Sequence, residues 1–227
     1  MKEVKLYIAT LLFTAFGLVS NAQTIGIKTG ANFANVNSEL YIDAVNNAFK
    51  TNTNFLIGVY GELPLHTNIS FQPELQFIQK GFSASESTSV DILGLDIPLG
   101  ASVETNINYI ETPMLFKFKT SESNAKAYAL AGPAIGYATS ANLEPKVMGF
   151  LSFNLPDQSI DLSSDIYNRV DISGIVGVGG SIDFGNNTIF TDIRYQHSFN
   201  NMLNDPIVDL MLSNKGFQIN AGYGFRF

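Results

Sequence analysis

The sequence predicts an all-β fold, an eight-stranded antiparallel transmembrane (up-and-down) β-barrel with four long external loops. Apolar and polar residues alternate in one segment after another, which is the pattern of strands with two different faces. The connections between these segments are alternately long and short, as in outer-membrane barrels. Charged residues make up only 15% of the chain and hydrophobic residues 45%, whereas a typical soluble domain has about 25% charged residues.

The first 22 residues predict an export signal, which leaves residues 23–227 as the barrel domain. Two lysines give a positively charged start, an apolar run covers residues 6–19, and the small residues "SNA" precede Gln23. This order of segments is typical of a secretory signal peptide. The alternative is a retained membrane anchor, but the apolar run is short for a helix that spans a bilayer.

The strand pattern is clearest over residues 68–81, "NISFQPELQFIQKG". One face carries Ile69, Phe71, Leu75 and Phe77, and the other carries Ser70, Gln72, Glu74 and Gln76. The same period of two predicts the other strands. In chain order, all eight predicted strands lie within residues 24–33, 54–63, 68–81, 108–119, 127–138, 170–184, 188–199 and 216–227.

The predicted connections place the long loops at one end of the barrel. The long ones cover residues 34–53, 81–105, 139–168 and 199–214, and the short ones cover 64–67, 120–125 and 185–187. Short periplasmic turns, long external loops and an even strand number are features of bacterial outer-membrane barrels. The long loops hold apolar stretches. One interpretation is that strands continue above the membrane and the loops pack into a cap; the other is a surface for a protein partner or an apolar ligand.

The final strand explains how the sheet avoids a free edge. Backbone polar groups in a bilayer must be paired internally, so a membrane-spanning sheet has to close on itself. We expect the last strand to pair with the first, and Tyr223, Phe225 and Phe227 to form part of an aromatic girdle at one interface. The terminal phenylalanine resembles the C-terminal signature by which the barrel assembly machinery receives outer-membrane proteins.

If the apolar residues face lipid, a set of charged residues faces the lumen. We expect these charges to form a salt-bridged plug, because an eight-stranded interior fills with side chains or holds one small ligand. The alternative is a narrow ion path. Pro73 and Pro113 lie inside two predicted strands, and we expect β-bulges there. The predicted lumen charges are Lys28, Glu62, Glu74, Glu111, Lys117, Asp183, Asp192, Arg194 and Arg226.

No catalytic residue, cofactor or metal site is predicted. Cysteine is absent, which excludes disulfides and thiolate zinc sites, and the two histidines have no ligand partner at useful spacing. The formal net charge of −7 argues against nucleic acid as a partner. An enzymatic alternative would rest on Ser198 beside His197, without a further triad residue.

Several blocks resemble the PorT-type outer-membrane β-barrel family of Bacteroidota. They are "TIGIKTGANFANV", "FQPELQFIQKGF", "NYIETPMLFKFK", "YALAGPAIGYATSAN" and "DISGIVGVGGSIDFG". The resemblance covers residues 24–227 and implies an integral protein of the outer membrane, in contact with its lipid. The eponymous member is linked to protein secretion, which membership alone does not carry over, and the family defines no catalytic residues.

These observations predict a non-enzymatic outer-membrane barrel with a plugged polar lumen. Its external loops are expected to bind a partner or to stabilise the envelope. Two alternatives stay open: a small channel or transporter for ions or an apolar molecule, and an accessory factor in protein secretion. The charges in the lumen distinguish a channel from a closed barrel, because paired charges oppose conduction.

Overall fold

The computed structural model describes residues 23–38, 49–92, 95–120, 123–148, 153–154, 158–160, 168–200 and 212–227. The predicted signal, residues 1–22, lies outside these ranges. The described residues form one ten-stranded sheet. Its strands are β1 (Thr24–Ser38), β2 (Phe49–His66), β3 (Ile69–Ile92), β4 (Leu95–Lys119), β5 (Ala125–Met148), β6 (Phe153–Asn154), β7 (Gln158–Ile160), β8 (Val170–Phe184), β9 (Asn187–Ser198) and β10 (Leu212–Arg226).

Eight of these strands close into a barrel, as predicted. Their order is β4-β3-β2-β1-β10-β9-β8-β5, and pairing of β4 with β5 closes the ring. The first and last strands pair from Thr24↔Arg226 to Ser38↔Leu212. Among the described strands, the short strands β6 and β7 pair with β5 alone, over its residues 141–147. Every pairing is antiparallel, so the fold is an up-and-down barrel without a free edge.

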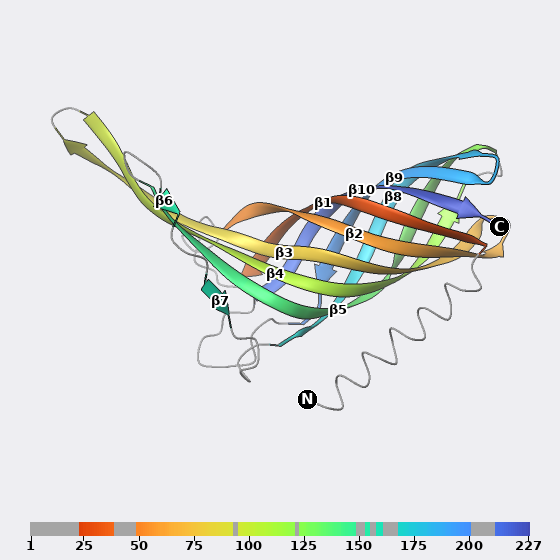
Figure 1. The fold of residues 1–227 in the computed structure, drawn as a ribbon, viewed down its shortest axis with the longest axis horizontal. Coiled ribbons are helices and arrows are strands. Elements are labelled where there is room, and N and C mark those ends of the chain that lie inside the picture. Colours follow the sequence, from red (N-terminus) through yellow and green to blue (C-terminus); the bar gives the residue numbers. More distant parts are fainter. Residues whose placement is uncertain are drawn as a thin grey trace.

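The two ends of the barrel differ, as Figure 1 shows. The start of β1, the end of β10 and the turn at residues 67–68 lie at one end. The turn between β8 and β9 belongs to the same end, and its Gly185 has a φ of 61°, a conformation that glycine adopts without steric cost. We call this the short-turn end and the opposite one the hairpin end. In the outer-membrane barrel that the sequence predicts, the short-turn end is expected to be periplasmic and the hairpin end external.

The sequence predicts a long loop over residues 81–105. In the structure, the described residues of this segment form the outer part of a β-hairpin. β3 and β4 stay paired as far as Ile92↔Leu95. Within the described residues, β3 beyond Ala84 and β4 before Gly100 pair only with each other. Figure 1 shows this two-stranded ribbon projecting beyond the barrel. The apolar stretch at residues 90–99 is therefore part of paired strands, which is the first of the two interpretations of the apolar loop segments.

The expected bulges at the two strand prolines are wrong. In the pairing of β2 with β3, the register shifts between Thr51 and Leu56 and between Pro64 and His66. In the pairing of β4 with β5, it shifts between Asn108 and Tyr109. At Pro73 and Pro113 the ladder is interrupted and then resumes in the same register. A proline removes one ladder donor, and this loss needs no extra residue in the strand.

The two faces of the wall differ as the alternation predicted. Ile27 and Val178 face outward and are 63% and 62% exposed, whereas Arg194 faces inward and is fully buried. The lumen is, however, less polar than predicted, because many inward-facing residues are apolar. One inner apolar cluster comprises Leu56, Ile78, Ile107, Tyr109, Ala138 and Ala141, and a second comprises Tyr60, Leu115, Tyr128, Leu130, Ala134, Ile175 and Phe190.

Candidate functional site

The predicted lumen charges form four groups, three inside the barrel and one at its mouth. We name these groups the Arg194 layer, the Lys80 layer, the Glu62 group and the Asp183 rim, and define each below. β3 runs from the short-turn end to the hairpin end and passes Glu74 before Lys80. The Lys80 layer is therefore nearer the hairpin end than the Arg194 layer.

The Arg194 layer comprises Arg194, Lys28, Glu74 and Asp192. Arg194 Nη1 lies 3.0 and 2.9 Å from the two carboxylate oxygens of Glu74. Its Nε and Nη2 donate to Asp192 at 2.8 and 2.9 Å. Lys28 donates to Glu74 as well. Two cations thus meet two carboxylates in a buried, charge-neutral group, which is the arrangement that buried ions need.

Three polar neighbours complete the coordination of this layer. Gln72 Nε2 donates to Glu74 at 2.7 Å, Asn220 Nδ2 donates to Asp192 at 2.8 Å, and the Tyr128 hydroxyl donates to Asp192 at 3.1 Å. These hydrogen bonds come from β3, β10 and β5, so the layer ties opposite walls of the barrel together.

The Lys80 layer comprises Lys80, Glu111 and Asp171. Lys80 Nζ lies 2.5 Å from Glu111 Oε2 and 2.9 Å from Asp171 Oδ2. Gln76 Nε2 donates to Glu111 Oε1 at 2.7 Å, and Gln196 Nε2 donates to Glu111 Oε2 at 2.9 Å. One cation therefore meets two buried carboxylates, and the group carries a formal charge of one negative unit.

The Glu62 group lies nearer the short-turn end. Glu62 accepts from Lys117 at 3.0 Å, from Lys119 at 2.7 Å and from Ser70 at 2.9 Å. Lys117 also lies 4.2 Å from the centroid of the Tyr128 ring, a cation–π distance.

The Asp183 rim closes the short-turn end. Asp183 accepts from Lys126 at 2.5 Å, from Arg226 at 2.8 Å and from Thr188 at 2.7 Å. The Arg226 side chain is 43% exposed, so this predicted lumen charge lies at the mouth rather than inside.

An aromatic layer fills the lumen beside the Arg194 layer and the Glu62 group. Tyr60 and Phe190 pack edge to face with ring centroids 5.3 Å apart. The glycine opposite each ring in the neighbouring strand gives it room: a Cβ on Gly222 would lie 2.3 Å from Phe190, and one on Gly26 would lie 2.4 Å from Tyr60. The interior is thus closed by rings as well as by ion pairs.

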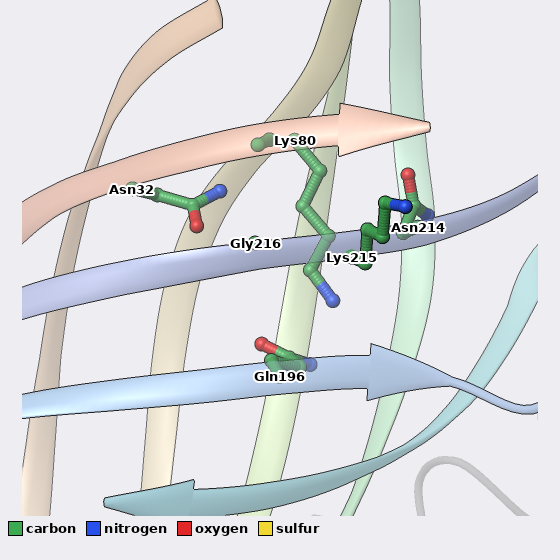
Figure 2. A pocket seen from close by; sticks show the side chains of 7 residues that line it. Asn32, Lys80, Gln196, Asn214, Lys215 and Gly216 are labelled. Carbon is green, nitrogen blue, oxygen red and sulfur yellow. The ribbon is translucent and has the colours of Figure 1, made fainter. Parts of the chain in front are cut away.

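A small polar cavity adjoins the Lys80 layer. Figure 2 shows the Lys80 side chain running toward Gln196, with Asn32 and Asn214 on either side. The other lining residues are Ala34, Lys215 and Gly216. The space open to the centre of a water molecule is about 10 Å³, which suffices for about one water.

Sequence reasoning missed four charged members of the lumen: Lys80, Lys119, Lys126 and Asp171. Lys80 lies at the end of the predicted third strand, next to a segment that was expected to be a loop. Alternation marks Lys119 and Asp171 as inward-facing, because each is two residues from a lumen-facing neighbour in its predicted strand. Lys126 precedes a predicted strand of small residues, where alternation does not distinguish the two faces.

The residues of the predicted girdle lie on the outer wall. Tyr223 and Phe225 are 44% and 43% exposed, and Phe227 is 75% exposed. The rings of Phe225 and Phe227 pack edge to face at 5.4 Å. Their exposure on the outer face near the short-turn end agrees with the position of an interfacial belt.

Ser198 and His197, the basis of the enzymatic alternative, do not lie on the same face of the wall. Ser198 is buried on the lumen side, whereas His197 stacks against Tyr195 on the outer side, because neighbouring residues in a strand point to opposite faces. Within the same described ranges, no group of three histidine, aspartate or glutamate side chains is arranged to hold a metal. No described helix is long and apolar enough to cross a membrane.

Comparison with solved structures finds several bacterial barrels. Ail of Yersinia pestis is 17% identical, with 89% of this chain and 98% of that chain covered and a TM-score of 0.40. Neisserial surface protein A is 12% identical, with coverage of 89% and 97% and a TM-score of 0.44. OprG from Pseudomonas aeruginosa is 10% identical, with coverage of 91% and 96% and a TM-score of 0.40.

No curated protein matches the sequence. The family model of the outer membrane protein beta-barrel domain matches residues 21–204. This match covers most of the chain, and the closed eight-stranded barrel is the fold that the family description names. The chain therefore belongs to the outer membrane protein β-barrel domain family and is a protein of the outer membrane.

Proposed function

We propose that this protein is a non-enzymatic barrel with a closed lumen that acts through its external strands, by binding a protein or surface ligand or by stabilising the envelope. The observation that carries the proposal is the cross-linked interior. The single side chain of Arg194 is fully buried and donates hydrogen bonds to carboxylates of two strands, Glu74 of β3 and Asp192 of β9. A path for ions would have to break these bonds.

In this proposal, the surface that binds a partner lies at the hairpin end. The outer part of the β3–β4 hairpin presents two free backbone edges within the described residues. Free edges can pair with an extended segment of another chain. The register places Val90 opposite Ile97 and Ile92 opposite Leu95, so apolar residues are paired across this ribbon.

The alternative function is a small channel or transporter. The unbalanced Lys80 layer and the adjoining polar cavity favour it, because rings of charge and water-filled spaces line cation paths. The aromatic layer and the neutral Arg194 layer oppose it.

An accessory role in protein secretion is a further alternative, which rests on the resemblance to the PorT-type family of Bacteroidota. Co-purification of the protein with a secretion complex from its native membrane would support that role. In every case the protein's partners would include outer-membrane lipid and, during biogenesis, the barrel assembly machinery.

Single-channel recording tests the proposal. The protein is refolded in detergent, its folded state is checked by the gel-mobility shift on boiling, and it is inserted into a planar bilayer. We expect no discrete conductance steps. Reproducible steps that change when Arg194 or Glu74 is replaced would overturn the closed lumen in favour of the channel.

A further inference from the structure

We propose that the Lys80 layer binds one small monovalent cation, Na⁺ or K⁺, through oxygen atoms of Glu111, Asp171 and the neighbouring glutamine amides. This inference concerns the lumen itself, and it does not require that the external strands bind a partner.

The first argument is the charge of the layer. Glu111 and Asp171 are 0% and 4% exposed, and the ion pairs of both run to the same ammonium group, that of Lys80. A buried charge without a counter-charge is costly. Lys215 also borders the cavity, but it lies between the inward-facing Asn214 and Gly216, so strand alternation directs it to the outer face of the wall. One further positive charge would neutralise the layer.

The second argument is a pair of buried amide oxygens on side chains of the hydrogen-bonded network around Glu111. Gln76 Oε1 and Gln218 Oε1 have no hydrogen-bond partner within the described part of the chain. The two side chains are 2% and 0% exposed. Buried amide oxygens without a donor are rare in proteins.

The orientation of these amides is fixed by chemistry. Gln76 Nε2 donates to Glu111 Oε1 at 2.7 Å, and a flipped amide would place an oxygen against the carboxylate. Gln218 Nε2 donates to Gln196 Oε1 at 2.6 Å, and Gln196 in turn donates to Glu111 at 2.9 Å. Both free oxygens therefore belong to the hydrogen-bonded network around Glu111.

The proposed ligands are all oxygen atoms, and this selects the kind of ion. Carboxylate and amide oxygens suit hard cations, and amide oxygens can replace the water shell of Na⁺ or K⁺. A divalent ion would reverse the charge of the layer instead of neutralising it. The adjoining cavity of about 10 Å³ is bordered by Gln196, whose amide donates to Glu111, and has room for about one water molecule.

The Arg194 layer offers a matched control within the same strand. Gln72 and Gln76 are both 2% exposed, both donate Nε2 to a carboxylate at 2.7 Å, and both leave Oε1 without a partner in the described residues. They differ in the charge of the layer that they join, which is neutral around Gln72 and negative around Gln76. Binding that depends on this charge should respond to Gln76 alone.

The experiment measures thermal unfolding of the full barrel in a nonionic detergent at equal ionic strength in NaCl, KCl and choline chloride. Choline is too large for the site. We expect the melting temperature to be a few degrees higher in NaCl or KCl than in choline chloride, because a ligand that binds only the folded state raises its stability. Asp171→Asn should abolish this difference and Gln76→Leu should reduce it, whereas Gln72→Leu should leave it unchanged.

Two results would overturn the proposal. The first is an equal melting temperature in all three salts, including the case in which acidification alone stabilises the protein, since the layer would then hold a proton. The second is an equal loss of the salt difference in Gln72→Leu and Gln76→Leu, which keeps the test decisive even if Asp171→Asn does not fold. Conductance in bilayers would contradict the closed lumen but not the bound cation, so the two proposals fail separately.

Discussion

The Arg194 layer and the Lys80 layer lie in the same tube and use the same kinds of side chain, but their charges balance differently. In the first, Lys28 and Arg194 meet Glu74 and Asp192. In the second, Lys80 alone meets Glu111 and Asp171. Each layer also recruits a glutamine of β3 as a donor, so the number of cations is the main difference.

The charge balance distinguishes the layer that closes the lumen from the layer that, in our proposal, also binds a cation. A charge-neutral group in the lumen has no excess charge that would attract a further ion. A group with one excess carboxylate attracts a cation and stays stable only when the charge is compensated. The negative layer lies nearer the hairpin end than the neutral layer does.

The largest expected effect comes from removing the central cation of the neutral layer. Arg194→Met leaves Glu74 and Asp192 buried with Lys28 as their one remaining cation, so we expect the free energy of unfolding to fall by about 3–5 kcal/mol. Urea unfolding in detergent, followed by the gel-mobility shift, measures it. The charge-balanced Arg194→Met/Asp192→Asn double variant should recover part of the loss, and a cost for the single variant below about 1 kcal/mol would contradict a stabilising role for the layer.

The corresponding change in the negative layer sharpens the contrast. Lys80→Met leaves Glu111 and Asp171 facing each other without a cation, and we expect a loss of about 3 kcal/mol. Adding Asp171→Asn returns the layer to its original charge of one negative unit and should restore more than half of the stability. If the double variant is no more stable than Lys80→Met, charge balance is not what the layer requires.

A smaller effect is expected from the glycines beneath the aromatic layer. Gly222→Ala would place a Cβ 2.3 Å from Phe190 and 2.6 Å from the carbonyl oxygen of Ile27, and overpacking of this kind costs about 1–3 kcal/mol. Gly180→Ala is the matched control, because its Cβ would face outward and lie 3.6 Å from the nearest atom. Thermal unfolding of both variants decides the matter, and equal melting temperatures would show that the ring does not need the glycine.

The sequence predicted the closed barrel and the direction of most side chains because a period of two is a local property. Glu74 and Glu111 were assigned to the lumen by their neighbours in the strand, without knowledge of their partners. The partners came from other strands: Arg194 is 120 residues from Glu74, and Lys80 is 91 residues from Asp171. Such pairings depend on barrel closure and register, which alternation does not determine.

The same limit explains the errors in the prediction. The extension of β3 and β4 beyond the barrel depends on pairing across the hairpin, and the sequence there has glycine and proline that also suit a loop. The inner apolar clusters were missed because residues such as Leu56 lie in runs where both faces are apolar. Within such a run, composition does not distinguish the lumen from the lipid.

The smallest expected effect lies at the Asp183 rim. Lys126→Met removes one of the donors to Asp183, but Arg226 at 2.8 Å and Thr188 at 2.7 Å remain, and the group lies at the mouth of the barrel near water. Ion pairs in such positions contribute about 0–1 kcal/mol. Lys28→Met in the Arg194 layer is the comparison, because Lys28 is 2% exposed and also shares its carboxylate with an arginine. We expect the Lys28 variant to lose several times more unfolding free energy than the Lys126 variant, and equal losses would mean that depth in the lumen does not set the strength of these ion pairs.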